Sequence, residues 1–510
     1  MLNKVGNLGG IFGQKALHPL ADSRELKKIV SELPKDNAFK ALDEIAGWLE
    51  SLQAADELPV DRLHEAVRQL EEAAQPSLRR LARDYLHSAR LSKTEEKRLW
   101  SINYGFWTLL AGAYERCLAD KAKADQLKSA LPAICTRLIA ALAAVLKWEQ
   151  FHYGPSSGEV WRRLGSALLL AEEAGIATKP VSIGAASGMS SAVQEYQKAM
   201  IFLAASMDSL LPIEIELAEH LIAQYLSGFV FTAEALHDSV YWVDLRLAQP
   251  PLRLARMPEQ AQPTQRFLKP GQAHADIESL LATLERGGDV PPEISLGAQY
   301  SPKMLIPVLR HLAAYLAPIP PQRKHDRHRV KHRMSVLNGL VNAFVAFSGE
   351  FGGRPAGLQM ESWVVDNVSR GGFGAVVSQI PADWLKVGAL LAMQPEGGEN
   401  WLIGIVRRYQ RTTENEARVG IETFARQAVS IEVKAKTASS YAAVPGIPSL
   451  LVEEGCEAGE VRLVLPAASF DLRESLEYTH QGKRYLLTPV AMQEHNAEFE
   501  LARYRRYSVG

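Results

Sequence analysis

The sequence predicts a multidomain α+β protein, with an all-α N-terminal part followed by two small β-rich modules. Three observations lead to this prediction. A chain of 510 residues is too long for one ordinary hydrophobic core. Up to about residue 235, apolar residues recur at three- to five-residue steps, which is the spacing of amphipathic helices. Beyond a proline-rich stretch that ends at Pro321, apolar and polar residues mostly alternate, as they do in strands.

The N-terminal part, residues 1–235, is predicted to be a helical domain. Asp22 and Glu25 have the spacing of a capping box, and Leu138, Leu142 and Leu146 follow one face of a later helix. The pattern fits an irregular helical domain or a degenerate array of helical hairpins. Both suit contact with a protein partner, whose identity the sequence does not give. Breaks between helices are expected at Leu33–Pro34, Gln75–Pro76, Gly154–Pro155 and the Gly/Ser-rich segment 184–191.

A mixed connector is predicted for residues 236–318. A strand pattern starts at Val240, and two helices are expected near residues 275–286 and 302–316. Pro318-Ile-Pro-Pro321 then marks a stiff linker. The first β-rich module is predicted to cover residues 319–436. The second covers residues 443–510 and is expected to be a companion barrel that contacts the first.

Composition and charge exclude several classes of protein. Lys and Arg number 57 and Asp and Glu 58, so the chain has no overall field that would attract DNA or a membrane surface. The three cysteines Cys117, Cys135 and Cys456 form no CxxC pair, which indicates reduced thiols in a cytoplasmic protein. The most apolar stretch, residues 134–146, is too short to cross a bilayer and is predicted to be a buried helix. No transmembrane segment and no signal peptide are expected.

The residues after the linker are strongly basic in a chain that is otherwise neutral. Six of the twelve residues from Gln322 to Arg333 are Lys or Arg, and one is acidic. An apolar strand pattern begins at Met334, directly after this segment. We therefore prefer the downstream of two possible registers of an RxxxR pattern, which are Arg329 with Arg333 and Arg323 with Arg327.

A second motif, Asn367-Val-Ser369-Arg-Gly-Gly372, lies at the end of one strand-like stretch and before another. Together the two motifs resemble the signature of the PilZ family, which is RxxxR entering the first barrel strand and [DN]xSxxG at a strand end. The resemblance continues through the strand patterns at 386–392 and 401–424, and it covers roughly residues 323–435. Either motif alone is weak, but the two in order among the expected strands are specific.

This resemblance implies a PilZ-like antiparallel β-barrel that binds cyclic di-GMP. It implies a bacterial signalling effector without enzymatic activity or metal. Ligand binding would change domain packing or partner binding and so regulate motility, pili, adhesion or exopolysaccharide. The residues implied are Arg329 and Arg333 on phosphate and guanine; Asn367, Ser369 and Gly372 on the barrel wall; and Arg323 and Arg327 as extra phosphate contacts.

The chemistry of these residue types agrees with such a ligand. A cyclic dinucleotide presents two phosphates and two guanine bases. The planar fork of arginine pairs with a phosphate or with guanine O6 and N7. The short side chains of Asn367 and Ser369 can hydrogen-bond base or phosphate, and Gly372 allows close approach of the backbone.

Other functions are weaker alternatives. The histidines at 325, 328 and 332 have helical spacing, but the surrounding cations would repel a metal ion. We find no GxSxG or HExxH motif that would indicate an enzyme. Two alternatives stay open. The first is an interaction scaffold whose PilZ-like barrel has lost nucleotide binding. The second is a nucleic-acid binder, which the lack of aromatic residues within the basic segment disfavours.

Overall fold

The computed structural model describes residues 18–509 apart from 57, 89–90, 120–124, 185–187, 293, 295–299, 323–325, 349–359, 381–383 and 437–445. The chain divides into two compact units. The first comprises Met1–Trp148, Ser157–Ala204 and Glu219–Ser279. The second comprises Glu149–Ser156, Ala205–Ala218 and Leu280–Gly510. Two short segments from the helical half of the sequence therefore belong to the unit that holds most strands.

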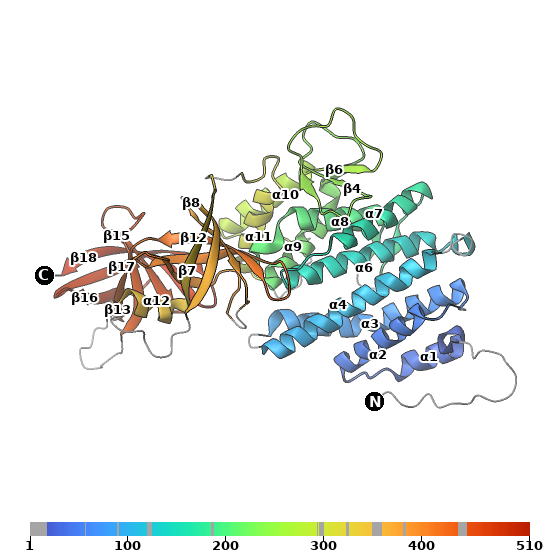
Figure 1. The fold of residues 1–510 in the computed structure, drawn as a ribbon, viewed down its shortest axis with the longest axis horizontal. Coiled ribbons are helices and arrows are strands. Elements are labelled where there is room, and N and C mark those ends of the chain that lie inside the picture. Colours follow the sequence, from blue (N-terminus) through green and yellow to red (C-terminus); the bar gives the residue numbers. More distant parts are fainter. Residues whose placement is uncertain are drawn as a thin grey trace. The chain divides into compact units, whose positions relative to one another are not determined.

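Helices form most of the first unit, as the periodicity predicts, and α2, α3 and α4 lie side by side in it (Figure 1). Their shared core contains Ile45 on α2, Leu70 on α3 and Leu110 on α4, all fully buried. The helices of the helical half are α1 (Ser23–Glu32), α2 (Ala38–Gln53), α3 (Val60–His87), α4 (Lys93–Leu118), α6 (Leu131–Phe151), α7 (Gly158–Glu173), α8 (Ala192–Ala204) and α9 (Pro212–Gln224).

One expected break is absent. Helix α3 continues through Pro76, because Leu70, Ala74 and Leu78 around it are buried and their packing outweighs one missing backbone hydrogen bond. The Gly/Ser-rich segment 184–191 does separate two helices, α7 and α8, as expected, and it takes part in a two-stranded pairing. Its strands are β1 (Val181–Ser182) and β2 (Met189–Ser190), and residues 185–187 between them lie outside the described residues.

Helix α6 contains the apolar stretch that the sequence predicts to be buried. Among the described residues, it is the one helix long and apolar enough to span a membrane. However, 67% of its apolar window is buried inside the structure. Its Arg137 is buried too, and it forms an ion pair with Glu71 of α3 at 2.5 Å and donates to the carbonyl oxygen of Ser182 at 3.1 Å. The Tyr114 hydroxyl donates to the same oxygen of Glu71.

A small antiparallel sheet with the strand order β3-β6-β4-β5 joins the predicted connector to the end of the predicted helical domain, where β3 lies. The strand expected from Val240 is present as β4, and the two expected helices are present as α10 and α11. The bounds are β3 (Val230–Thr232), β4 (Tyr241–Asp244), β5 (Leu252–Arg253), β6 (Gln265–Lys269), α10 (Gly271–Glu285) and α11 (Pro302–Tyr315).

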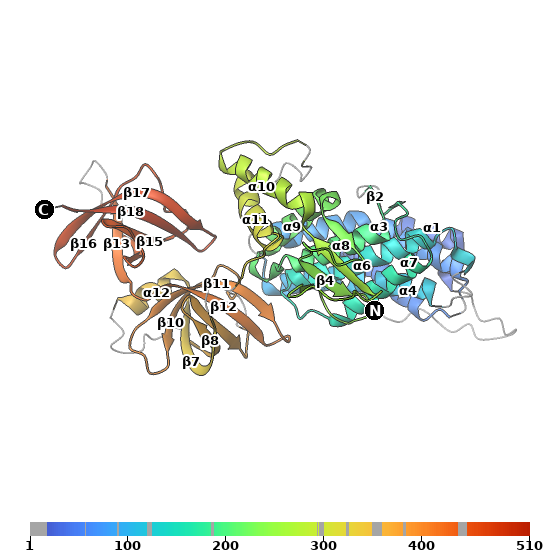
Figure 2. The ribbon, with the colours of Figure 1, turned by 90° about the horizontal axis from the view of Figure 1, so that it is seen from above.

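The PilZ-like region is a closed six-stranded antiparallel barrel, as the resemblance implies (Figure 2). Val336, Trp363, Met393 and Val419 are buried and fill its interior. Helix α12 (Gly339–Phe347) follows the first strand. The strands are β7 (His328–Asn338), β8 (Glu361–Ser369), β9 (Gly372–Val377), β10 (Leu390–Pro395), β11 (Leu402–Arg411) and β12 (Ala417–Ala425).

The C-terminal module is a second closed six-stranded barrel with the same connectivity. If the strands are numbered from one to six within each barrel, both barrels close in the order 1-2-3-6-5-4. The strands are β13 (Val429–Ala435), β14 (Ile447–Val452), β15 (Glu460–Pro466), β16 (Leu476–His480), β17 (Lys483–His495) and β18 (Phe499–Val509).

Strand β13 is the point where this structure differs from the domain limits expected from sequence. Its residues fall within the predicted first module, 319–436, yet it pairs with β14 and β16. The physical reason is closure: β7 pairs with β10, so the first barrel has no open edge for another strand. The two barrels share a core in which Leu340 and Ala343 of α12 meet Leu450 and Phe499 of the second barrel.

Candidate functional site

A cavity of about 230 Å³ lies on the first barrel, where β8 ends and β9 begins. The predicted motif residues Asn367, Ser369 and Gly372 contribute to its wall, and so does Arg327 from the basic segment. The other lining residues are Gly371 and Phe373 of the β8–β9 hairpin, Arg407 and Arg408 of β11, and Gly420, Ile421 and Glu422 of β12.

One row of directly paired residues crosses five strands beneath this cavity. Residues paired in this way share a face of the sheet. Two residues in the middle of the row are glycines, which add no side chain to this face. A methyl group on Gly374 would lie 2.1 Å from Nδ2 of Asn367, so the amide side chain occupies the space that this glycine leaves. The row runs Arg329 of β7, Asn367 of β8, Gly374 of β9, Gly420 of β12 and Arg408 of β11.

The neighbouring row holds the tightest backbone contact of the site. Gly372 pairs with Ser369 on one side and with Glu422 on the other. The Ser369 hydroxyl donates to the carbonyl oxygen of Gly372 at 3.3 Å. A methyl group on Gly372 would lie 2.0 Å from the carbonyl oxygen of Ile421, a distance that no side chain tolerates. The glycine of the motif is therefore required for the close approach of β9 to β12.

Register shifts surround the cavity on three strands. They lie between Arg329 and His332 on β7, between Val365 and Asn367 on β8, and between Val406 and Arg408 on β11. On β11 the extra residue breaks the alternation of inward and outward side chains. Val406 is buried, but Arg407 and Arg408 both leave the core. The bulge thus aims two consecutive arginines toward the same cavity.

The charges at the cavity favour an anion. Arg327, Arg407 and Arg408 face one carboxylate among the lining residues, that of Glu422. Arg407 donates from Nε to Glu422 at 2.7 Å and holds Glu494 of β17 with both terminal nitrogens, at 2.8 Å and 2.7 Å. Burial opposes the charged form of Arg407, but the two carboxylates outweigh it and raise the pKa of the guanidinium.

The structure brings some of the predicted binding residues together and not others. Arg329 lies across from Asn367 but does not line the cavity. Arg333 is exposed, pairs with Val364 and reaches Oγ of Ser362 at 3.5 Å, roughly 13 Å along the strand from Arg329. Arg323 lies outside the described residues, as does His325 of the predicted histidine cluster.

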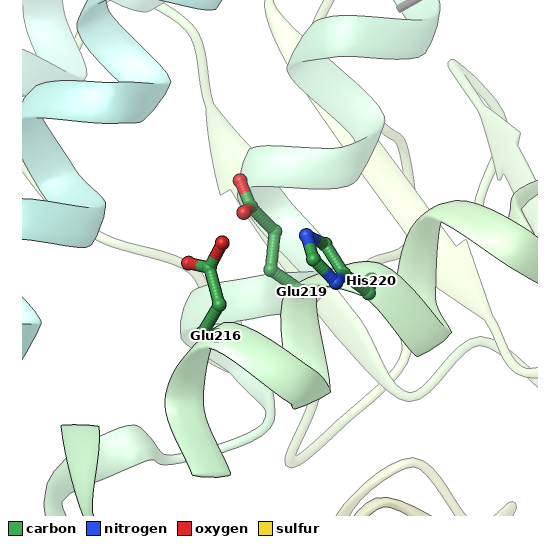
Figure 3. A group of neighbouring side chains, drawn as sticks. All are labelled: Glu216, Glu219 and His220. Atoms are coloured by element: carbon green, nitrogen blue, oxygen red, sulfur yellow. The ribbon is translucent and has the colours of Figure 1, made fainter. Parts of the chain in front are cut away.

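A metal-like cluster elsewhere was not singled out in the sequence. Glu216, Glu219 and His220 of α9 offer ligand atoms within 4.8 Å of one another (Figure 3). However, the Lys147 ammonium group lies 2.6 Å from Glu219 and neutralises one of the two carboxylates. Three acidic and imidazole groups on one partly exposed helix face do not by themselves indicate a metal site.

The sequence reasoning missed Arg407, Arg408 and Glu422. A signal existed in the strand pattern from Trp401 to Arg408, where two arginines follow each other and interrupt the alternation. A break of this kind indicates a bulge, but the side to which each arginine points depends on pairing with β12.

Comparison with known families identifies two parts of the chain. Residues 24–234 match the family described as the N-terminal domain of the cyclic-di-GMP receptor FimW. Residues 358–429 match the family described as the middle PilZ domain of the same receptor. The two matches follow each other in that order and cover the helical half and most of the first barrel. A comparison with curated proteins returns no match.

Proposed function

Because the chain belongs to the PilZ family and its residues 24–234 match the N-terminal domain of the cyclic-di-GMP receptor FimW, we propose that it binds cyclic di-GMP at the cavity on its first barrel. The observation that carries the proposal is the meeting of Arg327, Asn367, Ser369 and Gly372 around one cavity. Arginine forks suit the phosphates and the guanine edges of this ligand, and the amide and hydroxyl groups suit its remaining polar atoms.

The protein acts as a signalling effector, not an enzyme. The cavity is lined by guanidinium, amide, hydroxyl and carboxylate groups without a histidine or cysteine beside Ser369. Ligand binding changes domain packing or the binding of a protein partner to the helical half. The regulated output is motility, pili, adhesion or exopolysaccharide. A cytoplasmic location fits three free cysteines, two of them buried.

Ligand binding is confined to the first barrel. In the second barrel the hairpin at the same topological place, between β14 and β15, carries Glu453, Glu454 and Glu457. Carboxylates there repel the phosphates of a dinucleotide. The Glu454 carboxylate also accepts the Arg426 backbone N–H at 2.7 Å.

Isothermal titration of the full chain with cyclic di-GMP, with GTP and cyclic di-AMP as controls, tests the proposal. Selective binding supports it. The absence of heat at high ligand concentration would leave the scaffold alternative, in which the barrel only holds the helical half in place.

Two arginine substitutions decide which RxxxR register binds the ligand. We expect Arg327→Ala to weaken cyclic di-GMP binding by about ten-fold or more, because it removes a charge-assisted contact at the cavity. We expect Arg333→Ala to change affinity by less than about three-fold, because its side chain lies away from the cavity. Titration of both variants checks this. If Arg333→Ala weakens binding more than Arg327→Ala does, the ligand is bound by the downstream pair, Arg329 with Arg333.

A further inference from the structure

The motif-bearing hairpin forms only one side of the cavity. The opposite side is β11, whose two consecutive arginines are aimed there by the bulge after Val406. Each arginine is also held by a group outside the first barrel. Arg407 is held by Glu494 of the second barrel, through a fork of two hydrogen bonds. Arg408 lies 3.8 Å from Asp208 and donates to the Tyr315 hydroxyl of α11 at 2.5 Å.

These holding contacts are partly open to solvent. The side chains of Arg407 and Arg408 are 41% and 47% exposed, and Glu494 and Asp208 are about a quarter exposed. Partly exposed ion pairs contribute modestly to stability, and the bidentate pair of Arg407 with Glu494 is the stronger of these two. A phosphate group competes well for the same guanidinium fork, because it offers more acceptor oxygens in the matching geometry.

Strand β11 also carries the attachments of the two segments that the second unit takes from the helical half. The rings of Tyr409 and Tyr153 lie 5.1 Å apart, and the Arg411 backbone N–H donates to the Tyr153 carbonyl oxygen at 2.8 Å. The Tyr153 hydroxyl in turn donates to the Leu210 carbonyl oxygen at 2.8 Å, two residues from Asp208. A change at Arg408 therefore reaches segment 205–218 directly.

We propose that Arg407 and Arg408 are ligand-binding residues, which exchange Glu494 and Asp208 for the phosphates of the bound dinucleotide. This inference rests on the proposed function. It assigns the far wall of the cavity to phosphate binding. It also names the two contacts that loosen on binding, one to the second barrel and one to segment 205–218. The carboxylates and the ligand compete for the same two arginines. A substitution that weakens a carboxylate contact is therefore expected to strengthen ligand binding.

Titration of the full chain with cyclic di-GMP tests both directions of this competition. We expect Arg407→Gln and Arg408→Gln each to bind about ten-fold more weakly than the unmodified protein. We expect Glu494→Gln and Asp208→Asn to bind about two- to five-fold more tightly, because each releases an arginine. Arg418→Gln on β12 is the matched control. It removes an exposed arginine of the same barrel that does not line the cavity, and its affinity is expected to stay unchanged.

The outcomes separate this inference from the proposed function. If the unmodified protein does not bind cyclic di-GMP, the proposed function fails. If it binds and the two arginine variants bind equally well, the function stands and the far wall is not part of the site. Tighter binding by the carboxylate variants cannot be caused by misfolding, since a misfolded protein does not bind the ligand more tightly. Unchanged or weaker binding in both of them would overturn the exchange of partners.

Discussion

A single methyl group added at Gly372 is expected to weaken ligand binding strongly and to destabilise the first barrel. In Gly372→Ala the new carbon would lie 2.0 Å from the Ile421 carbonyl oxygen and 3.1 Å from the Glu422 Cα. Because these are backbone atoms of a central strand, β9 and β12 must move apart. Overpacking of this kind costs about 1–3 kcal/mol. Ser369 and Glu422, which pair with Gly372 on either side, move with the strands, so we expect affinity for cyclic di-GMP to fall by more than about ten-fold.

Gly105→Ala is the matched control for this variant, because it adds the same methyl group where no atom lies within 4 Å. Gly105 lies within helix α4, so alanine there is expected to be neutral or to stabilise by up to about 1 kcal/mol. Isothermal titration measures binding, and thermal unfolding measures stability. Normal ligand affinity in Gly372→Ala would show that β9 and β12 adapt and that the glycine is not required.

Removal of Arg137 is expected to destabilise the helical half strongly. Arg137→Met leaves the Glu71 carboxylate buried with only the Tyr114 hydroxyl as a side-chain partner. Burial raises the pKa of Glu71, against the attraction of Arg137, so the charge is already costly with its partner in place. An uncompensated buried charge costs about 3–5 kcal/mol, which is a large share of the stability of a typical domain.

A second substitution tests whether the loss comes from the unpaired charge. We expect Glu71→Leu combined with Arg137→Met to recover most of the stability, because apolar residues of similar size often replace a buried ion pair without loss. Arg162→Met, which breaks the exposed pair with Glu159, is a control expected to leave stability nearly unchanged. Urea unfolding followed by the helical circular dichroism signal distinguishes these cases. Equal losses in the single and double variants would attribute the effect to packing alone.

The ligand motif illustrates what local sequence can predict. Asn367, Ser369 and Gly372 lie on one strand end and its hairpin, so their proximity is a property of the chain over six residues. The strands around them are confirmed, because alternation of apolar residues depends on each strand alone. The closed barrel that the PilZ resemblance implies is confirmed as well. The assignment of these residues to a ligand stays a prediction until binding is measured.

The basic segment shows where local reasoning stops. Two registers of RxxxR were open, and the apolar pattern after Arg333 favoured the downstream one. In the structure Arg327 is at the cavity, while Arg333 lies further along β7, because pairing with β8 continues past His332 to His328. Which arginine faces the cavity is thus set by cross-strand register, which a single strand does not contain.

By itself the sequence determined the order of a helical half and β-rich modules, the PilZ resemblance and the hairpin side of the site, because periodicity and turn motifs act over a few neighbouring residues. Only the tertiary structure decided that the last module has the connectivity of the first barrel, and that β13 belongs to it. It also decided that Arg407 and Arg408 complete the cavity. These features depend on pairing and closure between strands far apart in the chain, and on one bulge whose direction is set by its partner strand.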